Sequence, residues 1–113
     1  MRIRNVLQEY EAMLEPVPAS PYPGARGKAE WKVYGDGTRQ CKVKVSGLDL
    51  PDGSKLELVV DDRQIAAVAV QNGMARYRRE TERGEAVPYV ESNQVLQVIY
   101  AGNVILEGKF YSE

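Results

Sequence analysis

Residues 29–45 read AEWKVYGDGTRQCKVKV, two stretches of alternating apolar and polar residues on either side of a Gly-Asp-Gly turn. Alternation with a period of two is typical of a β-strand with one buried face. Glycine and aspartate tolerate the positive φ angles that tight hairpin loops require. This stretch therefore predicts a β-hairpin, with Trp31 and Val33 on the inner face of its first strand and Val43 on that of its second.

Four further turn signals divide the rest of the chain at similar intervals. They are Asp52-Gly53, Asp61-Asp62, Asn72-Gly73 and Gly102-Asn103. The strands predicted between them are residues 56–60, 64–70, 74–81, 94–101 and 103–111. Evenly spaced short strands with no helical pattern between them favour an antiparallel sandwich or barrel. We expect residues 28–113 to form an all-β domain, an antiparallel immunoglobulin-like sandwich of about seven strands.

Two segments of this domain differ from the simple alternation. Residues 64–70 are apolar on both faces, which predicts a central strand or one that is covered twice. Residues 82–93 contain Val87-Pro88-Tyr89-Val90 and no strand pattern. We expect this segment to cross from one sheet of the sandwich to the other.

The N-terminal residues have a different period. Apolar side chains recur there at spacings of three and four, which predicts an amphipathic helix over residues 1–15 that ends before Pro16. The residues of this stripe are Ile3, Val6, Leu7, Tyr10, Met13 and Leu14. Residues 16–27 hold four of the six prolines of the chain and predict a stiff, extended linker.

The last predicted hairpin leaves an apolar face that needs a cover. Its core side is assigned to Leu96, Val98, Leu106 and Phe110. The N-terminal helix is the expected cover for the opposite side, and a stiff linker disfavours a sharp return within one chain. We therefore expect a homodimer in which each helix packs on the other subunit. The candidate interface residues are Ile3, Val6, Leu7, Tyr10, Leu14, Val95, Ile99, Ile105 and Tyr111.

Composition excludes several classes of partner. The 113 residues make one domain, and the net charge of -1 gives no overall field that attracts nucleic acid. No apolar run approaches the length of a membrane span. The single cysteine favours a reducing compartment, so we expect a cytoplasmic protein, or a secreted one if an export signal was removed.

Catalytic and metal-binding equipment is sparse. The sequence has no histidine, which removes the commonest general base and the commonest zinc ligand. Cys41 alternates with inward-facing valines and is expected to be a buried, unreactive thiol. The aspartates lie in or beside turns, where aspartate commonly bonds its own backbone. We expect no catalytic residue, no cofactor and no metal, and hence no enzyme.

Two surface features allow binding functions. Arginines gather in the segment 76–83, but interleaved glutamates are expected to cancel much of their field, so no nucleic-acid binding is predicted there. These arginines are Arg76, Arg78, Arg79 and Arg83. Tyr34 and Tyr89 are aromatic residues that could stack on a sugar if they are exposed.

The stretch VSGLDLPDGSKL at residues 45–56, with Val60-Asp61-Asp62, Val87-Pro88 and Gly108-Lys109-Phe110, resembles a pattern in uncharacterised small bacterial β-sandwich proteins. The resemblance covers about residues 40 to 111 and consists mostly of turns and core positions. It implies an immunoglobulin-like or chordin-domain-like sandwich. It transfers no catalytic or binding residue to this chain.

Three functions stay open at this point. The first is a non-enzymatic interaction or assembly module, because the chain lacks catalytic groups but has an apolar stripe beside a linker. The second is a module that binds a carbohydrate or another small polar ligand on exposed tyrosines. The third is a hydrolase that uses only carboxylates, whose pairing in space leaves no spacing signature.

Overall fold

Nine β-strands form one antiparallel sheet in the described part of the chain, residues 5–113 of the computed structural model. The strands are β1 (Val6–Pro16), β2 (Arg26–Tyr34), β3 (Arg39–Ser46), β4 (Lys55–Val60), β5 (Arg63–Ala69), β6 (Ala75–Glu80), β7 (Val95–Tyr100), β8 (Asn103–Lys109) and β9 (Tyr111–Ser112). The strands β2 to β8 correspond to the seven predicted from the turn signals, so the all-β prediction is confirmed.

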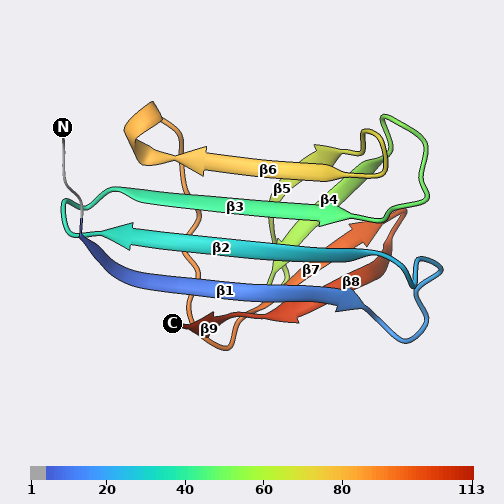
Figure 1. Ribbon diagram of the computed structural model, residues 1–113, viewed down its shortest axis with the longest axis horizontal. Helices are drawn as coiled ribbons and strands as arrows, with labels where there is room; N and C mark the ends of the chain where they lie inside the picture. The colour runs from blue at the N-terminus through green and yellow to red at the C-terminus, as the bar shows by residue number, and fades with distance from the viewer. Residues whose placement is uncertain (1–4) are drawn as a thin grey trace.

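The strands close into a barrel-like sheet. Their order is β5-β4-β7-β8-β1-β2-β3-β6, with β9 paired to β1. Figure 1 shows the long strands β1, β2, β3 and β6 side by side in front, and β4, β5, β7 and β8 crossing obliquely behind them. The two layers are joined where the end of β1 pairs with β8, and β5 and β6 approach each other on the far side without pairing. The predicted immunoglobulin-like sandwich is therefore replaced by a nearly closed barrel.

The predicted N-terminal helix is wrong. Residues 6–16 form the longest strand, β1, and the only helical segment in residues 5–113 is the short 3-10 turn η1 (Thr81–Arg83). Ile3, the first residue of the predicted stripe, lies outside the described residues. A helix that covers the last hairpin, within the chain or across a dimer, is thus not part of this fold.

The misreading has a physical cause in the spacing of the apolar residues. A spacing of four is in phase with both a helix and a strand, so Tyr10 and Leu14 fit either period. The strand also places Ala12 inward, where it is fully buried, while Met13 points out and is 53% exposed. Outward Glu9 forms an ion pair with Lys32 of β2, with 3.9 Å between the charged atoms.

The proline segment is a hairpin connection and not a long tether. β1 and β2 pair from Val6↔Tyr34 to Leu14↔Gly27, so the chain reverses between them. Two tight turns achieve this reversal: Ser20 N–H donates to the Val17 carbonyl, and Ala25 N–H donates to that of Tyr22. The prolines stiffen the connection, but they do not prevent the return.

A β-bulge in the last hairpin explains why its buried and exposed residues differ from those predicted by simple alternation. The register of β7 and β8 shifts between Val98 and Ile99, so that Val98 faces Leu106 and Ile99 faces Val104. Ile105 is the extra residue, and both it and Leu106 are buried. Val95 and Ile99 are only partly buried. The continuous apolar patch predicted on this hairpin is therefore wrong.

Strand β5 lies at one end of the strand order and is not central. Ile65, Ala66 and Val68 are partly buried, whereas Ala67 and Ala69 are exposed. Alanines expose little apolar surface, so a strand that looked apolar on both faces needs no second cover. The segment after β6 does cross between the layers as expected, and its Val87 and Val90 are buried in the core.

The core fills the space between the two layers. Its largest fully buried side chains are Phe110, Leu14, Leu56, Leu58, Leu96, Ile105 and Leu106. The Phe110 ring meets Trp31 edge to face, with 5.2 Å between ring centroids and 81° between planes. Such a pair contributes about 0.5–1.5 kcal/mol beyond the area that it buries. Strand β2 is thus fixed, through the barrel interior, against the residue that links β8 and β9.

Substituting Gly108 by alanine should destabilise the fold, because a Cβ there would collide with the Met13 carbonyl where β1 crosses β8. We expect the free energy of unfolding to fall by about 1–3 kcal/mol, measured by urea denaturation. Gly24→Ala is the matched control, since a Cβ at Gly24 meets nothing within 4 Å. Equal stability of the two variants would contradict the close contact proposed between β1 and Gly108 of β8.

Cys41 should be unreactive in the folded protein. Its side chain is fully buried, and burial raises the pKa of its thiol to about 11. We expect a thiol reagent to label Cys41 only after denaturation. Cys41→Ser should lower stability by about 1–3 kcal/mol, the penalty for a buried hydroxyl without a partner. Rapid labelling of the native protein would show that the strand opens locally.

Candidate functional site

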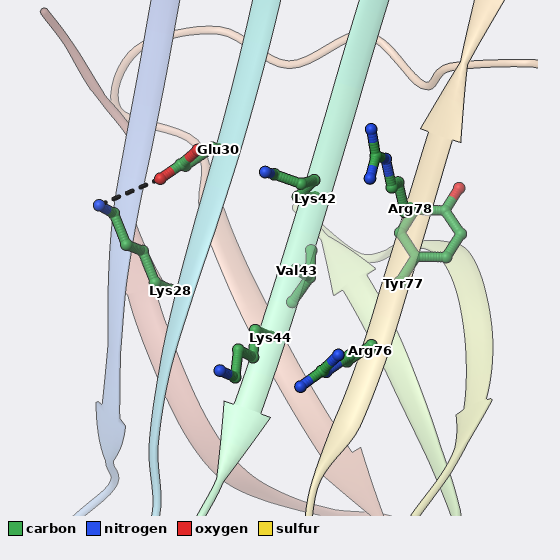
Figure 2. Close-up of a pocket in the computed structure, with 8 residues that line it drawn as sticks. All are labelled: Lys28, Glu30, Lys42, Val43, Lys44, Arg76, Tyr77 and Arg78. Carbon is green, nitrogen blue, oxygen red and sulfur yellow. Dashed lines mark ion pairs between the residues drawn. The ribbon is translucent and has the colours of Figure 1, made fainter.

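The outer face of β3 and β6 carries a square of four cations. The strands pair in the register Lys42↔Arg78 and Lys44↔Arg76. Because alternate residues of a strand share a face, all four side chains project to the same side, and all four are exposed. We call Lys42, Lys44, Arg76 and Arg78 the cation quartet. Figure 2 shows them on the two neighbouring strands.

The quartet lines an open groove of about 420 Å³. Lys28 and Glu30 of β2 form its side toward β1, and the backbone of β3 forms its floor. Tyr77 also borders the groove, but its side chain is buried and the Arg79 guanidinium lies 4.7 Å from its ring centroid. The groove is therefore lined by positive charge and offers no exposed aromatic ring.

Ion pairs neutralise only part of this charge. The Lys28 ammonium lies 3.1 Å from carboxylate oxygens of both Glu11 and Glu30. Figure 2 shows its side chain leaning toward Glu30 and away from β3. Hydrogen bonds to Glu11 and then Glu30 raise the pKa of Lys28 above its usual range. Lys28 is thus held charged but already partnered.

The quartet itself is mostly unpaired. Arg78 lies 2.7 Å from a Glu80 oxygen, and this bond raises the pKa of its guanidinium. Lys42, Lys44 and Arg76 have no carboxylate within ion-pair distance among the residues that the structure describes. These three adjacent cations therefore form no ion pair with the described chain, although Glu30 lies opposite Lys42 across the β2–β3 pair.

Cross-strand register makes this arrangement unfavourable for folding. Lys44 lies directly opposite Lys28 on one side and Arg76 on the other. Like charges at directly opposite positions destabilise a sheet. The row formed by Lys28, Lys44 and Arg76 across three strands therefore lowers the stability of the fold. A bound anion would reduce the repulsion between these cations.

Carboxylates bound the positive area. Glu11 on β1 accepts hydrogen bonds from Tyr111 and Lys28, with 2.8 Å between the Tyr111 hydroxyl and Glu11 Oε2. A hydrogen bond from Glu113, then those from Tyr111 and Lys28, lower the pKa of Glu11 to about 2. The same shared bond raises the pKa of Glu113. Glu11 therefore stays ionised beside Glu30, and the basic area ends at β2.

The residues predicted as an interface do not form one surface. Leu14 and Ile105 are core residues, each 1% exposed. Val6, Leu7 and Tyr111 are exposed. Tyr10, Val95 and Ile99 are partly buried. Leu14 and Ile105 are therefore unavailable to a partner, and the remaining described residues are divided among β1, β7 and β9.

Three aspartates accept backbone hydrogen bonds, but only Asp36 does so within its own turn, as predicted; Asp52 and Asp61 bond segments 20 and 34 residues away. The Asp36 carboxylate accepts the Thr38 N–H, that of Asp52 accepts the Asn72 N–H, and that of Asp61 accepts the Val95 N–H. Among residues 5–113, no group of three or more cysteine, aspartate or glutamate side chains is arranged to hold a metal ion. In the same range, no helix is long and apolar enough to cross a membrane.

No family model matches the chain, and no curated protein sequence matches it.

Sequence reasoning recognised Arg76 and Arg78 but not the quartet. Interleaved glutamates were expected to cancel the arginines, and Glu80 does pair with Arg78. Lys42 and Lys44 alternate outward in the sequence, which was a usable signal. The pairing of β3 with β6 could not be predicted, because the β4–β5 hairpin separates these two strands in the sequence.

Replacing the central lysine of the cationic row should stabilise the protein. Lys44→Gln removes two like-charge oppositions, so we expect the free energy of unfolding to rise by about 0.2–1 kcal/mol at low ionic strength. The gain should shrink at about 1 M salt, where screening is strong. Lys55→Gln is the control, because Lys55 faces Ala69. If urea denaturation shows that Lys44→Gln lowers the free energy of unfolding, the like-charge repulsion proposed for this row is contradicted.

Proposed function

We propose that this protein is a non-enzymatic binding module that holds an acidic segment of a partner protein on the cation quartet. The observation that carries the proposal is the set of three adjacent exposed cations without carboxylate partners among the described residues. Complementary charge across an interface increases association rate and specificity. A carboxylate-bearing partner would supply the missing counter-charges.

The limits of the basic area favour a short acidic segment over a long polyanion. Glu30 lies directly opposite Lys42, and Glu80 lies two residues from Arg78 on β6, so an extended nucleic acid strand would have to pass over carboxylates. Single-stranded nucleic acid is usually held by aromatic stacking as well as by charge. The one aromatic residue that borders the groove, Tyr77, is buried. We therefore propose no nucleic-acid function for this face.

The free edge of β6 offers a way to align such a segment. β6 ends the strand order, so one of its edges has no strand partner. At that edge, Glu80 N–H donates to the Glu85 carboxylate and the Glu80 carbonyl accepts the Glu85 N–H. Backbone groups repeat their direction every second residue, so those of Arg76 and Arg78 point to the same edge. An added strand there would place alternate side chains beside both arginines.

The module is proposed as non-enzymatic on chemical grounds. The chain has no histidine, and its one thiol is buried with a raised pKa. The carboxylates of the groove are engaged with lysines or arginines. The groove is thus equipped to hold a charged partner and carries no evident acid–base pair for a reaction.

The proposal is tested with a fluorescein-labelled peptide of alternating glutamate and threonine, about eight residues long to span one strand. We expect saturable binding by fluorescence anisotropy that weakens as salt rises from about 0.05 to about 0.3 M. Lys44→Gln/Arg76→Gln should weaken binding about tenfold, roughly 0.7 kcal/mol for each cation.

The matched control removes the same charge elsewhere. Lys55→Gln/Arg83→Gln also replaces one lysine and one arginine, both exposed and outside the groove. This control should bind the peptide as the native chain does. Equal weakening by the two double variants would reduce the effect to net charge and overturn the proposal. Tighter binding of single-stranded DNA of equal charge, with a steeper dependence on salt, would overturn the choice of an acidic protein segment.

A further inference from the structure

A second hollow, of about 550 Å³, opens at the end of the barrel near the start of β1. Tyr10, Trp31 and Val33 line it from β1 and β2. Residues 88–92 of the crossing segment form the facing wall. Mouths of β-barrels are common positions for small-ligand sites, and the volume is within the usual 300–1,000 Å³ range, as an order of magnitude. We call this hollow the mouth pocket.

An arginine points into this apolar and aromatic surrounding. Arg39 belongs to the inward-facing set of β3, two residues before buried Cys41, and it lines the mouth pocket. Its Nη1 atom is buried and has no hydrogen-bond partner among the described residues. A charged donor that is buried without an acceptor is costly, more so than a neutral one. The pocket therefore contains an unsatisfied positive donor.

An exposed tyrosine ring lies over this guanidinium. The Tyr89 ring centroid lies 3.9 Å from Arg39 Cζ, and Tyr89 is 71% exposed. The backbone beneath it is fixed: Trp31 Nε1 donates to the Pro88 carbonyl at 2.9 Å, and Arg63 Nη2 donates to the Tyr89 carbonyl at 2.9 Å. Rotation of the Tyr89 side chain can uncover the guanidinium while residues 88 and 89 keep their place.

We propose that the mouth pocket binds a sugar acid, with its carboxylate on Arg39 after Tyr89 moves aside. A carboxylate is the planar anion that a guanidinium binds with two parallel hydrogen bonds. The partly exposed Tyr10 ring on the pocket wall suits the apolar face of a sugar ring. Gln8, Glu91 and Ser92 also line the pocket and supply polar groups for ring hydroxyls. The carbohydrate-binding alternative from the sequence is thereby assigned to the mouth pocket, and its ligand is required to carry a negative charge.

The mouth pocket is independent of the cation quartet. Arg39 projects to the inner face of β3, whereas Lys42 and Lys44 project to the outer face. A ligand in the mouth pocket therefore does not need the groove, and the two proposals stand or fall separately.

Trp31 is the only tryptophan of the chain and lines the mouth pocket, so its fluorescence reports occupancy. We expect sodium glucuronate to change the emission of the full chain in a saturable way, and glucose at equal concentration and ionic strength to leave it unchanged. Arg39→Gln should weaken the response at least about tenfold, the loss of one charged hydrogen-bonded contact. Arg83→Gln, at an exposed arginine outside the pocket, should behave as the native chain.

Amide chemical shifts in a glucuronate titration keep the test decisive if Arg39→Gln fails to fold. The expected shifts fall on residues 8–10, 31–33, 39 and 88–92, and they should persist in Lys44→Gln/Arg76→Gln. Shifts confined to β3 and β6 around the quartet, or no saturable shift, would overturn the proposal. An equal response to glucose would refute the carboxylate requirement, and tighter binding of benzoate than of glucuronate would refute the sugar class.

Discussion

Strand β1 is shared by both layers, and the closure of the barrel depends on it. It pairs with β2 along most of its length, and its last residues, Glu15 and Pro16, pair with β8. The crossing is so close that position 108 has no room for a side chain. Ala12 and Leu14, just before the crossing, are buried between the layers. If residues 6–16 were helical, β2 and β8 would both have an unpaired edge and the barrel would open. Residues 6–16 therefore form a strand because they pair with β2 and β8, and not because of the spacing of their apolar residues.

The same closure decides where the two candidate sites lie. A strand in a closed sheet presents one set of alternate residues to the interior and the other to solvent. In β3 the inward set begins with Arg39 and continues with Cys41 and valines, while the outward set contains Lys42 and Lys44. The apolar inward residues fix the register of β3 against β2 and β6, because a slip by one residue would bury the lysines. Packing in the interior thus positions the cation quartet outside. Arg39 stands at the end of the inward set of β3, where the barrel opens into the mouth pocket.

Local signals were sufficient for most strands, and long-range pairing accounts for what they missed. The turns at Asp52-Gly53 and Asn72-Gly73 have the positive φ at glycine that their sequences predict, and they delimit β4 to β6. By contrast, a spacing of four at Tyr10 and Leu14 fits two periods, and only pairing with β2 and β8 selects the strand. Bulges are equally hidden, since an extra residue such as Ile105 changes which face is buried without changing composition. The cation quartet also depends on long-range pairing. The alternating pattern of each strand shows its own two outward cations, but the pairing of β3 with β6, which brings the four together, cannot be read from the sequence.

The net charge of this chain does not describe the local charge on its sheet. A total of -1 over 113 residues describes the field far from the molecule, whereas a contact samples charge within about one Debye length, roughly 10 Å. Within that range the register gathers Lys42, Lys44, Arg76 and Arg78 and leaves Glu11 and Glu30 at the border on Lys28. This arrangement costs stability, because Lys44 stands opposite a cation on both sides, while the Glu30 carboxylate stands opposite Lys42 and pairs with Lys28. A surface selected for stability alone would interleave them, as Glu9 and Lys32 do on the same sheet. The departure from that pattern is confined to one face, and it is the physical reason to look for a negatively charged partner there.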